Sequence, residues 1–209
     1  MSDETDSFDD SENDFEDEWY RWKEGYYREV LGQQEDLVQH ALIPYDVGGA
    51  LDLYFYSGKI PGTAMVTMEL SPSPEEGSSN DLMDRYEFVM FSRYPFEASE
   101  KTDSPFQKTM RDCYPILNLM GRYSEQATLN PCETVEFPED MEDVGGRCLI
   151  LNAWGEECQN EYNFGLMLIM EVHRSEMNFA REHGPDELFM RLDEAGYYPY
   201  SDMDRESVV

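Results

Sequence analysis

The segment from Asn163 to Val172 constrains the fold of this chain more than any other part of the sequence. Its centre, Phe164-Gly-Leu-Met-Leu-Ile-Met170, contains no charged residue. A strand with one face in water alternates apolar and polar residues, whereas a strand that is apolar at every position is covered on both faces. The run is also well short of the roughly 20 residues that a membrane-spanning helix needs. We therefore predict that it is a central strand of a sheet.

Runs of branched and aromatic residues indicate five further strands. The first two are separated by Gly58-Lys-Ile-Pro-Gly62, which has the composition of a turn, so they form a predicted hairpin. The five predicted strands are residues 51–56, 63–70, 86–91, 132–137 and 148–151.

An aromatic stripe predicts the first helix. Trp19, Trp22 and Tyr26 recur at helical spacing after a start near Glu18. Two apolar residues further along the chain allow this helix to continue as far as His40. We expect the aromatic stripe to pack on the sheet.

The second helix is predicted from its start signals. Asp103-Ser-Pro105 offers a cap residue followed by a proline in the first turn, and the helix then runs from Phe106 to Tyr123. Pro115 lies inside it and is expected to kink or divide it, because proline lacks the N–H donor and clashes with the preceding turn.

Two short helices are predicted near the end of the chain. Ser175 is the expected cap of the first, Gly184-Pro185 ends it, and the second covers about residues 185–195 with Gly196 as its cap. Strands thus lie before and after one central helix, and helices lie near both ends. This order predicts an α+β fold with one mixed, mostly antiparallel sheet flanked by helices.

The first 17 residues are expected to form a disordered acidic tail. Residues 1–18 hold ten acids and no base, and the tail has too little apolar surface to offset its ordering entropy. The remainder, residues 18–209, has the length of a single domain.

The net charge of −31 restricts the class of partner. It comes from 46 acidic against 15 basic residues, and removing the ten acids at the start still leaves −21. Such a charge repels nucleic acid phosphates and attracts basic proteins. Two interpretations remain open: a solvated or salt-adapted surface, and a surface that attracts a cationic protein partner.

The four cysteines suggest a reducing compartment. Their spacing contains no C-x-x-C pair, so no zinc ribbon is expected, and buried free thiols are the simplest interpretation. No signal peptide and no membrane span is predicted, so the expected location is cytoplasmic. The cysteines are Cys113, Cys132, Cys148 and Cys158.

No catalytic motif was found in the sequence. The chain has no nucleophile elbow, no phosphate-binding glycine loop and no histidine pair with metal-ligand spacing. His173 follows the long apolar strand and is expected to be a hydrogen-bonded residue at a strand end. The acidic stretch Glu139–Asp143 lacks the order of a calcium loop. We therefore expect no enzyme activity, no cofactor and no metal site.

Six short motifs stand in a fixed order after Gly48. They are Leu51-Asp-Leu-Tyr-Phe-Tyr56, Met65-Val-Thr-Met-Glu-Leu-Ser71, Tyr86-Glu-Phe-Val-Met90, Gly121-Arg-Tyr123, Leu166 to Met177, and Ser201-Asp-Met-Asp-Arg205. In the same order, suppressor of fused domains have L-D-x-Y, T-x-G-[ML]-S, E-L, A-R-Y, an apolar strand with a helix, and T-D-x-x-R. The chain resembles that family over about residues 20–209. Glu69 stands where the second motif has Gly.

The resemblance implies a mixed α+β module without catalytic activity. In the animal protein this domain, together with a second domain that is not expected here, clamps a transcription factor peptide by strand addition. The contacts to that peptide include the Tyr of A-R-Y and an acid shortly after the next Cys. They match Tyr123 and Glu133, which follows Cys132. The alternative for Tyr123 is a core aromatic residue at a helix end.

Two functions follow from the resemblance. Small stand-alone bacterial members resemble immunity proteins, so the chain is expected to neutralise a cognate toxin, and the toxin is expected to be basic. The alternative is a regulator that sequesters a transcription factor peptide by strand addition. Both make the partner a protein, and neither involves nucleic acid or a membrane.

Overall fold

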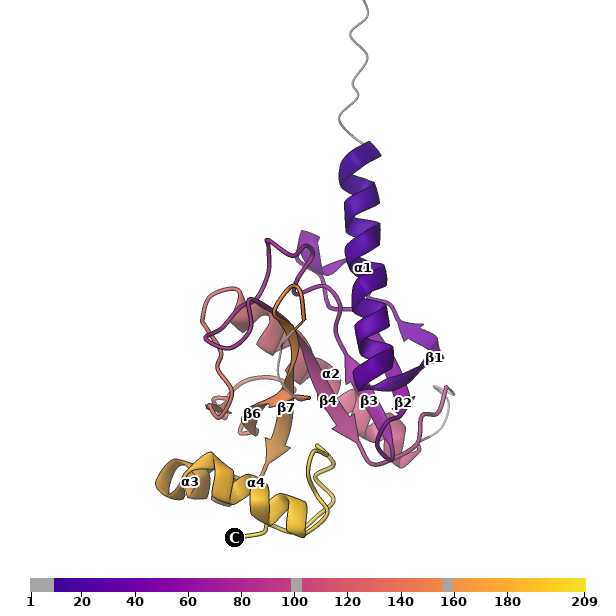
Figure 1. The fold of residues 1–209 in the computed structure, drawn as a ribbon. Helices are drawn as coiled ribbons and strands as arrows, with labels where there is room; N and C mark the ends of the chain where they lie inside the picture. Colours follow the sequence, from indigo (N-terminus) through magenta and orange to yellow (C-terminus); the bar gives the residue numbers. More distant parts are fainter. Residues whose placement is uncertain (1–9, 99–102, 156–159) are drawn as a thin grey trace, which may run out of the picture.

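The computed structural model describes residues 10–98, 103–155 and 160–209, with side chains described from Glu18 onward. Figure 1 shows one sheet with helices packed around it. The elements are α1 (Asp10–Val30), β1 (Gly32–Gln39), a 3-10 turn (Tyr45–Val47), β2 (Leu53–Gly58), β3 (Thr63–Val66), β4 (Arg85–Ser92), α2 (Pro105–Ser124), β5 (Thr134–Glu136), β6 (Cys148–Trp154), β7 (Phe164–Val172), α3 (Arg174–His183) and α4 (Pro185–Glu194).

The seven strands form a single sheet in the order β1-β2-β3-β4-β7-β6-β5. Every neighbouring pair is antiparallel except β4 and β7, which run parallel. The parallel pair arises because α2, β5 and β6 separate β4 from β7 along the chain. The predicted fold class, α+β with a mixed and mostly antiparallel sheet, is confirmed.

Strand β7 is the buried central strand that the sequence predicts. All nine of its residues are buried. Met167 and Ile169 point into the core under α2, whereas Leu166 and Leu168 point into the core on the opposite face. Because successive side chains of a strand point to opposite faces, both faces must be covered, and this explains the uninterrupted apolar sequence.

The helices cover the sheet in two layers. Helix α2 packs on one face through Phe106, Ile116 and Leu117. On the other face, α1 contributes Trp19 and Tyr27, and α3 and α4 contribute further apolar side chains. Figure 1 shows α1 beside the β1–β3 half of the sheet and α3 with α4 near its other half. Within the described residues, no helix is both long and apolar enough to cross a bilayer.

Helix α1 begins earlier than the predicted start near Glu18. Its backbone is helical from Asp10. Residues 10–17 of the expected disordered tail are therefore part of this helix in the structure, and residues 1–9 lie outside the described residues. The predicted aromatic stripe does pack on the sheet, since Trp19, Trp22 and Tyr26 have ring contacts with Phe164 of β7.

The predicted extension of this helix to His40 is wrong, because β1 occupies most of that range. Gly32 has a φ angle of 104°, and a Cβ atom there would lie 2.2 Å from the carbonyl oxygen of Ser57. Only glycine fits this close reversal, which turns the chain from α1 into β1 and places Gly32 opposite Gly58. Strand β1 is an edge strand rich in polar residues, so its sequence lacks a clear strand pattern.

The helices after β4 largely follow the predictions. The Ser104 hydroxyl accepts a hydrogen bond from the Gln107 N–H and caps α2. Helix α2 is not divided at Pro115. The predicted cap Ser175 is wrong: His173 is the cap residue of α3, and the Glu176 carboxylate accepts its N–H at 2.8 Å. The predicted break between α3 and α4 at Gly184 is confirmed.

The closing segment Ser201–Arg205 fastens the end of the chain to the domain. The Asp202 carboxylate accepts hydrogen bonds from the Ser92 hydroxyl at 2.8 Å, the Arg93 N–H at 2.7 Å and the Thr109 hydroxyl at 2.8 Å. It therefore ties β4 to α2. The aspartate of this motif has a structural role.

The arginine of the same motif is buried against α3. Arg205 makes two hydrogen bonds, of 2.6 and 2.7 Å, to Glu176, and both side chains are fully buried. Burial opposes ionisation of Glu176, but hydrogen bonds from Arg205 and from two main-chain N–H groups lower its pKa. The pair stays charged, and it fixes the end of the chain on the helix cap.

Candidate functional site

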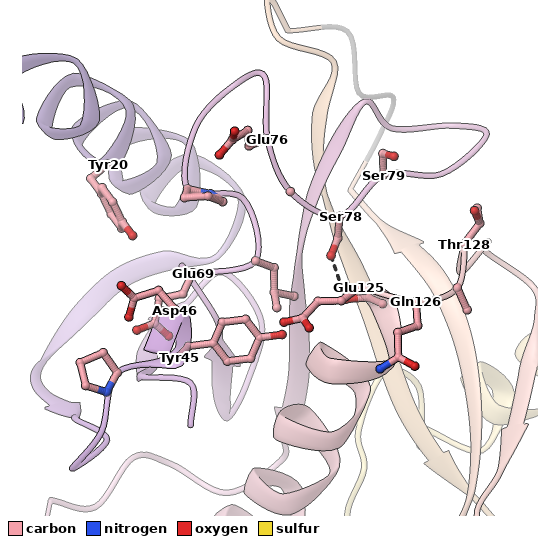
Figure 2. Close-up of a pocket in the computed structure, with 16 residues that line it drawn as sticks. Tyr20, Tyr45, Asp46, Glu69, Glu76, Ser78, Ser79, Glu125, Gln126 and Thr128 are labelled. Carbon is pink, nitrogen blue, oxygen red and sulfur yellow. Dashed lines mark hydrogen bonds between the residues drawn. The ribbon is translucent and has the colours of Figure 1, made fainter. Parts of the chain in front are cut away.

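A pocket of about 900 Å³ lies between four segments that are distant in the sequence. Its walls are Tyr20 of α1, residues 44–46 of the loop before β2, the segment from Glu69 to Ser79, and residues 124–128 at the end of α2 (Figure 2). Because no two of these walls adjoin in the chain, the pocket exists only in the folded domain.

Four carboxylates give the pocket its charge. Asp46, Glu69, Glu76 and Glu125 line it, and none of its lining residues is Lys, Arg or His. Figure 2 shows these side chains around one space. Like charges that gather in a concave site strengthen the local potential, so this pocket attracts cations.

Tyr45 contributes a buried hydroxyl to the pocket. The residue is only 7% exposed, and its hydroxyl makes no hydrogen bond of full geometry within the described part of the chain, although it lies close enough to Glu125 to interact with that carboxylate. Figure 2 shows the hydroxyl pointing toward Glu125. Burial raises the pKa of this phenol, and the neighbouring Glu125 carboxylate raises it further. A phenol directed at a carboxylate still has lone pairs that can accept an N–H donor.

Arg122 fixes the Tyr45 loop to the end of α2. Its guanidinium donates to the carbonyl oxygens of Tyr45 at 2.7 Å and Gly49 at 2.8 Å. It also lies 3.7 Å from the centre of the Tyr45 ring and pairs with Glu125 at 2.8 Å. Arg122 thus occupies a face of the ring and leaves the hydroxyl end for the pocket.

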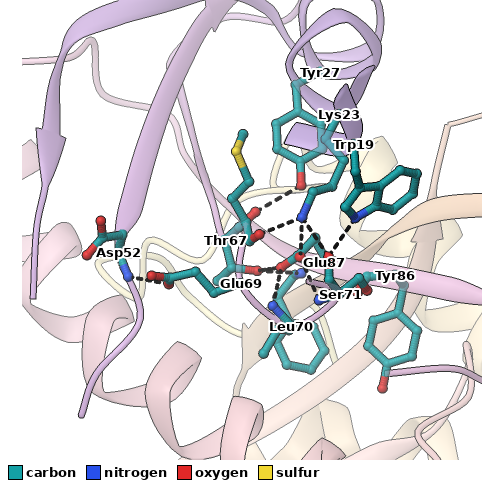
Figure 3. Close-up of polar contacts among 12 residues, drawn as sticks. Trp19, Lys23, Tyr27, Asp52, Thr67, Glu69, Leu70, Ser71, Tyr86 and Glu87 are labelled. Carbon is teal, nitrogen blue, oxygen red and sulfur yellow. Dashed lines mark hydrogen bonds and ion pairs between the residues drawn. The ribbon is translucent and has the colours of Figure 1, made fainter. Parts of the chain in front are cut away.

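Helix α1 shapes the opposite wall through three side chains on one stripe. Trp19, Lys23 and Tyr27 donate hydrogen bonds of 2.5 to 2.9 Å to main-chain carbonyl oxygens of residues 67, 68 and 71 (Figure 3). These carbonyl groups are therefore not available to a neighbouring strand. Strand β3 accordingly ends at Val66, and the prediction that it runs to Leu70 is wrong.

A buried ion pair completes this wall. Lys23 and Glu87 are both fully buried and lie 3.2 Å apart. The Glu87 carboxylate also accepts the Thr67 hydroxyl at 2.7 Å and the N–H groups of Leu70 and Ser71 at 3.1 and 2.9 Å. Burial lowers the pKa of Lys23, and the charge of Glu87 opposes that shift. The pair holds residues 67–71 in an irregular turn.

Glu69 lies in this turn and faces the pocket. One of its carboxylate oxygens accepts the Asp52 N–H at 2.6 Å. Burial raises the pKa of Glu69 to about 7, although the hydrogen bond from Asp52 opposes the shift. Glu69 is therefore a pocket acid whose charge changes near neutral pH.

The arrangement suits an organic cation better than a metal ion. Among the described residues, no group of three or more His, Cys, Asp or Glu side chains is close enough to hold a metal. The carboxylates are spread around a wide pocket, and Tyr45 adds a neutral oxygen among them. Such spacing fits a group with several N–H donors, such as a guanidinium or an ammonium on a flexible chain.

Similar proteins were found among solved structures. A protein described as a suppressor of fused homologue from Neisseria gonorrhoeae superposes with a TM-score of 0.56 and 16% identity, covering 92% of this chain and 97% of its own. Drosophila Suppressor of Fused superposes with a TM-score of 0.59 and 18% identity, and the match covers 88% of this chain and 49% of its own.

A structure of the Sufu–Fu complex gives a TM-score of 0.56 and 17% identity, covering 88% of each chain. The chain has the suppressor-of-fused fold. No protein-family model matches its sequence, and no curated protein matches it. The predicted resemblance is therefore confirmed as a fold, at an identity too low for sequence comparison.

The suppressor-of-fused motifs have clear structural roles here. The glutamate of the E-L motif is Glu87, which holds the turn at residues 67–71. The alanine of A-R-Y is Gly121, where a Cβ atom would lie 3.2 Å from the Tyr45 hydroxyl oxygen and 3.0 Å from a methyl carbon of Leu51. The glycine of the T-x-G motif is Glu69. Both departures thus lie at the acidic pocket.

The structure places the two predicted partner-binding residues at opposite ends of the connection from α2 to β5. Tyr123 is on the last turn of α2 and is 47% exposed, which argues against the core alternative. Glu133 is exposed, and its carboxylate accepts the Asn130 N–H at 3.0 Å. No direct contact between the two side chains is seen. Tyr123 adjoins the pocket wall that begins at Ser124.

His173 and two of the cysteines have the predicted roles. The His173 ring lies 3.0 Å from the Arg205 carbonyl oxygen, which confirms a hydrogen-bonded histidine at a strand end. Cys113 and Cys148 are buried free thiols as expected. Cys132 is a free thiol but is exposed, so the expectation of burial is wrong there. Cys158 lies outside the described residues.

An exposed apolar loop adjoins the pocket. Leu42, Ile43 and Val47 are large apolar residues with exposed fractions of 102%, 59% and 69%. They flank Tyr45 and Asp46, which line the pocket. Sequence reasoning missed Tyr45, Asp46 and Glu125 entirely, since residues from distant loops have no shared motif. The only sequence signal was Glu69 in place of a family glycine.

Proposed function

We propose that this chain is a non-catalytic protein-binding module whose partner is a basic protein. The observation that carries the proposal is the concentration of acid: a net charge of −31 and a pocket lined by four carboxylates and no basic residue. Complementary charge speeds the encounter of two proteins and discriminates between partners. The suppressor-of-fused fold supports it, because one similar structure is a complex, Sufu–Fu.

We further propose that the module acts as an immunity protein that neutralises a cognate toxin in the cytoplasm. Toxins that act on nucleic acid are commonly basic, since they must bind phosphates, and a strongly acidic partner can cover that surface. Tyr123 and Glu133 are proposed as additional contacts, because both are exposed beside the same connection.

Co-expression tests this function. The chain is produced with the protein encoded by the adjacent reading frame, and growth and complex formation are measured. We expect the neighbour to arrest growth alone, the chain to restore growth, and the two proteins to co-elute at 0.1 M salt and separate at 0.5 M or above, where the Debye length falls below about 5 Å. A neighbour that neither binds the chain nor loses toxicity contradicts the immunity role.

The alternative is a regulator that sequesters a transcription factor peptide by strand addition. It is favoured by the position of β5, an edge strand of the sheet that directly follows Glu133. On that edge, Arg181 bonds the Thr134 hydroxyl at 3.0 Å, so an added strand would meet side chains from α3. Loss of peptide affinity in Tyr123→Ala, with no effect of Glu69→Gln, would favour this alternative.

A further inference from the structure

We propose that the acidic pocket receives an arginine or lysine side chain of the basic partner, while Leu42, Ile43 and Val47 contact apolar residues beside that cation. This inference rests on the proposed function and names the surface of the chain that contacts the partner. The occupant is a segment of a protein that presents one cation next to apolar side chains.

The pocket acids retain capacity for a ligand. Asp46 accepts the Val47 N–H at 2.9 Å and Glu69 accepts one main-chain N–H, so each has oxygen lone pairs left. Glu125 pairs with Arg122 on one oxygen. Glu76 has no ion pair within the described part of the chain. An incoming guanidinium would therefore find several acceptors that the protein itself leaves open.

The Tyr45 hydroxyl is an independent sign of a ligand. It belongs to a residue that is more than nine-tenths buried, it makes no hydrogen bond of full geometry within the described chain, and Glu125, toward which it points, is the group that it interacts with. A phenol can donate its proton to a carboxylate and accept an N–H donor at the same time. A cation bound against Glu125 and Tyr45 would satisfy this group.

The exposed loop supplies the apolar part of the interface. Protein interfaces combine a few apolar anchors with a polar rim, and exposed apolar residues that cluster beside a charged pocket have that composition. Arg122 holds this loop to α2 through two carbonyl groups, so the anchors are presented on a fixed support.

Fluorescence anisotropy with short labelled peptides tests the inference. The probe carries one arginine flanked by leucines, and the matched peptide carries citrulline, which has the same shape without the charge. Since hydrogen bonds to charged groups contribute about 1.5–3 kcal/mol, we expect citrulline to weaken binding at least about tenfold. Equal binding of the two peptides, or no binding of the arginine peptide, would overturn the inference.

Substitutions locate the site. Glu69→Gln and Glu125→Gln are each expected to weaken binding of the arginine peptide roughly fivefold or more at pH 8. Val47→Ser is expected to weaken binding of both peptides. The matched control is Glu142→Gln, an exposed acid on another loop with the same change of charge. A loss in Glu142→Gln as large as in Glu69→Gln would mean that total charge and not the pocket binds the peptide.

Failure of this inference can be told apart from failure of the proposed function. If the neighbour-encoded protein still binds Glu69→Gln and Glu125→Gln as tightly as the wild type, the pocket is not the contact but the binding module stands. If the arginine peptide binds the pocket and no protein partner forms a complex, the pocket stands and the proposed function is wrong. Tighter binding of spermidine than of the peptide would mean a polyamine site and would overturn a protein ligand.

Discussion

Glu69 is an acid whose environment disfavours its charged form. Its environment raises its pKa to about 7 from an ordinary value of 4.5, and burial is the main cause. Groups in binding sites are often held in environments that cost stability. The charges of Asp52 and Glu87 add to the shift, whereas the hydrogen bond from the Asp52 N–H and the charge of Lys23 oppose it.

The stability of a Glu69→Gln variant should therefore depend on pH. Below pH 4.5 the side chain is protonated in both the folded and the unfolded chain, so the substitution changes little. Between pH 4.5 and 7 Glu69 ionises in the unfolded chain before it ionises in the folded chain, so the free energy of unfolding of the wild type falls as the pH rises. Glutamine does not ionise, so the variant does not show this fall. At pH 8 we expect Glu69→Gln to raise the free energy of unfolding by about 1 kcal/mol, a value reduced for partial exposure.

Urea denaturation at pH 4 and pH 8 measures this difference. Glu142→Gln is the control and should show no such gain. Glu171 also has a pKa raised to about 7 by burial, so the wild-type chain retains a second source of pH dependence that both variants share. An equal effect of Glu69→Gln at the two pH values would contradict the account.

At the residue scale, the sequence indicated some residues of the candidate site but not their burial or their contacts. Glu69 was visible as a departure from a family glycine, and Tyr123 and Glu133 were visible as motif matches. The burial of Tyr45 was not visible, because it depends on Arg122 and on the absence of a side chain at Gly121. Those contacts join residues more than 70 positions apart.

At the scale of elements, α1 is a clamp on the turn after β3. Three of its side chains bond the main chain of residues 67–71, and the buried pair of Lys23 and Glu87 lies at the centre. Removing one partner of a buried pair leaves an uncompensated charge, and this costs more than the pair itself contributes.

Lys23→Met should destabilise the domain by about 3 kcal/mol in urea denaturation. Adding Glu87→Gln should restore part of the loss, because it removes the uncompensated buried charge and the glutamine carbonyl can still accept one of the two main-chain N–H groups, of Leu70 or Ser71. Lys59→Met is the control, since Lys59 is exposed, and it should cost less than about 0.5 kcal/mol. A cost for Lys23→Met as small as for Lys59→Met would contradict the claim that α1 holds the turn after β3 through Lys23.

The closing segment makes a second prediction at this scale. Asp202→Ala removes the acceptor of four hydrogen bonds, which come from Ser92, the main chain and side chain of Arg93, and Thr109, so it should lower the free energy of unfolding by about 2–3 kcal/mol. Asp204→Ala, two positions away at an exposed residue, should cost less than about 0.5 kcal/mol. Thermal unfolding of both variants measures the contrast, and equal melting temperatures would mean that Asp202 does not tie these elements together.

The elements that sequence reasoning found are those with a strong local pattern. Strand β7 and the N-terminal cap of α2 were predicted because burial on both faces and a Ser-Pro start leave clear signatures. Strand β1 was missed because an edge strand with many polar residues has no such pattern. The end of β3 was missed because Lys23 and Glu87, not the local sequence, decide where the strand stops.

At the scale of the whole molecule, the residues that form the central sheet differ from those that form the proposed binding pocket. The chain has the suppressor-of-fused fold, and its central sheet contains the parallel β4–β7 pair. The acidic pocket lies outside that core and uses two positions where this chain departs from the family motifs, Glu69 and Gly121. Charge could be counted from the sequence, but only the fold gathers four of the acids around one pocket.

Hydrogen exchange of the chain with and without the arginine peptide tests the central claim most directly. We expect protection in residues 42–47, 69–79 and 124–128, the segments of the pocket and its apolar loop, and little change with the citrulline peptide. Protection confined to β5 and Tyr123, or equal protection by both peptides, would contradict a cation-binding pocket as the contact of this module.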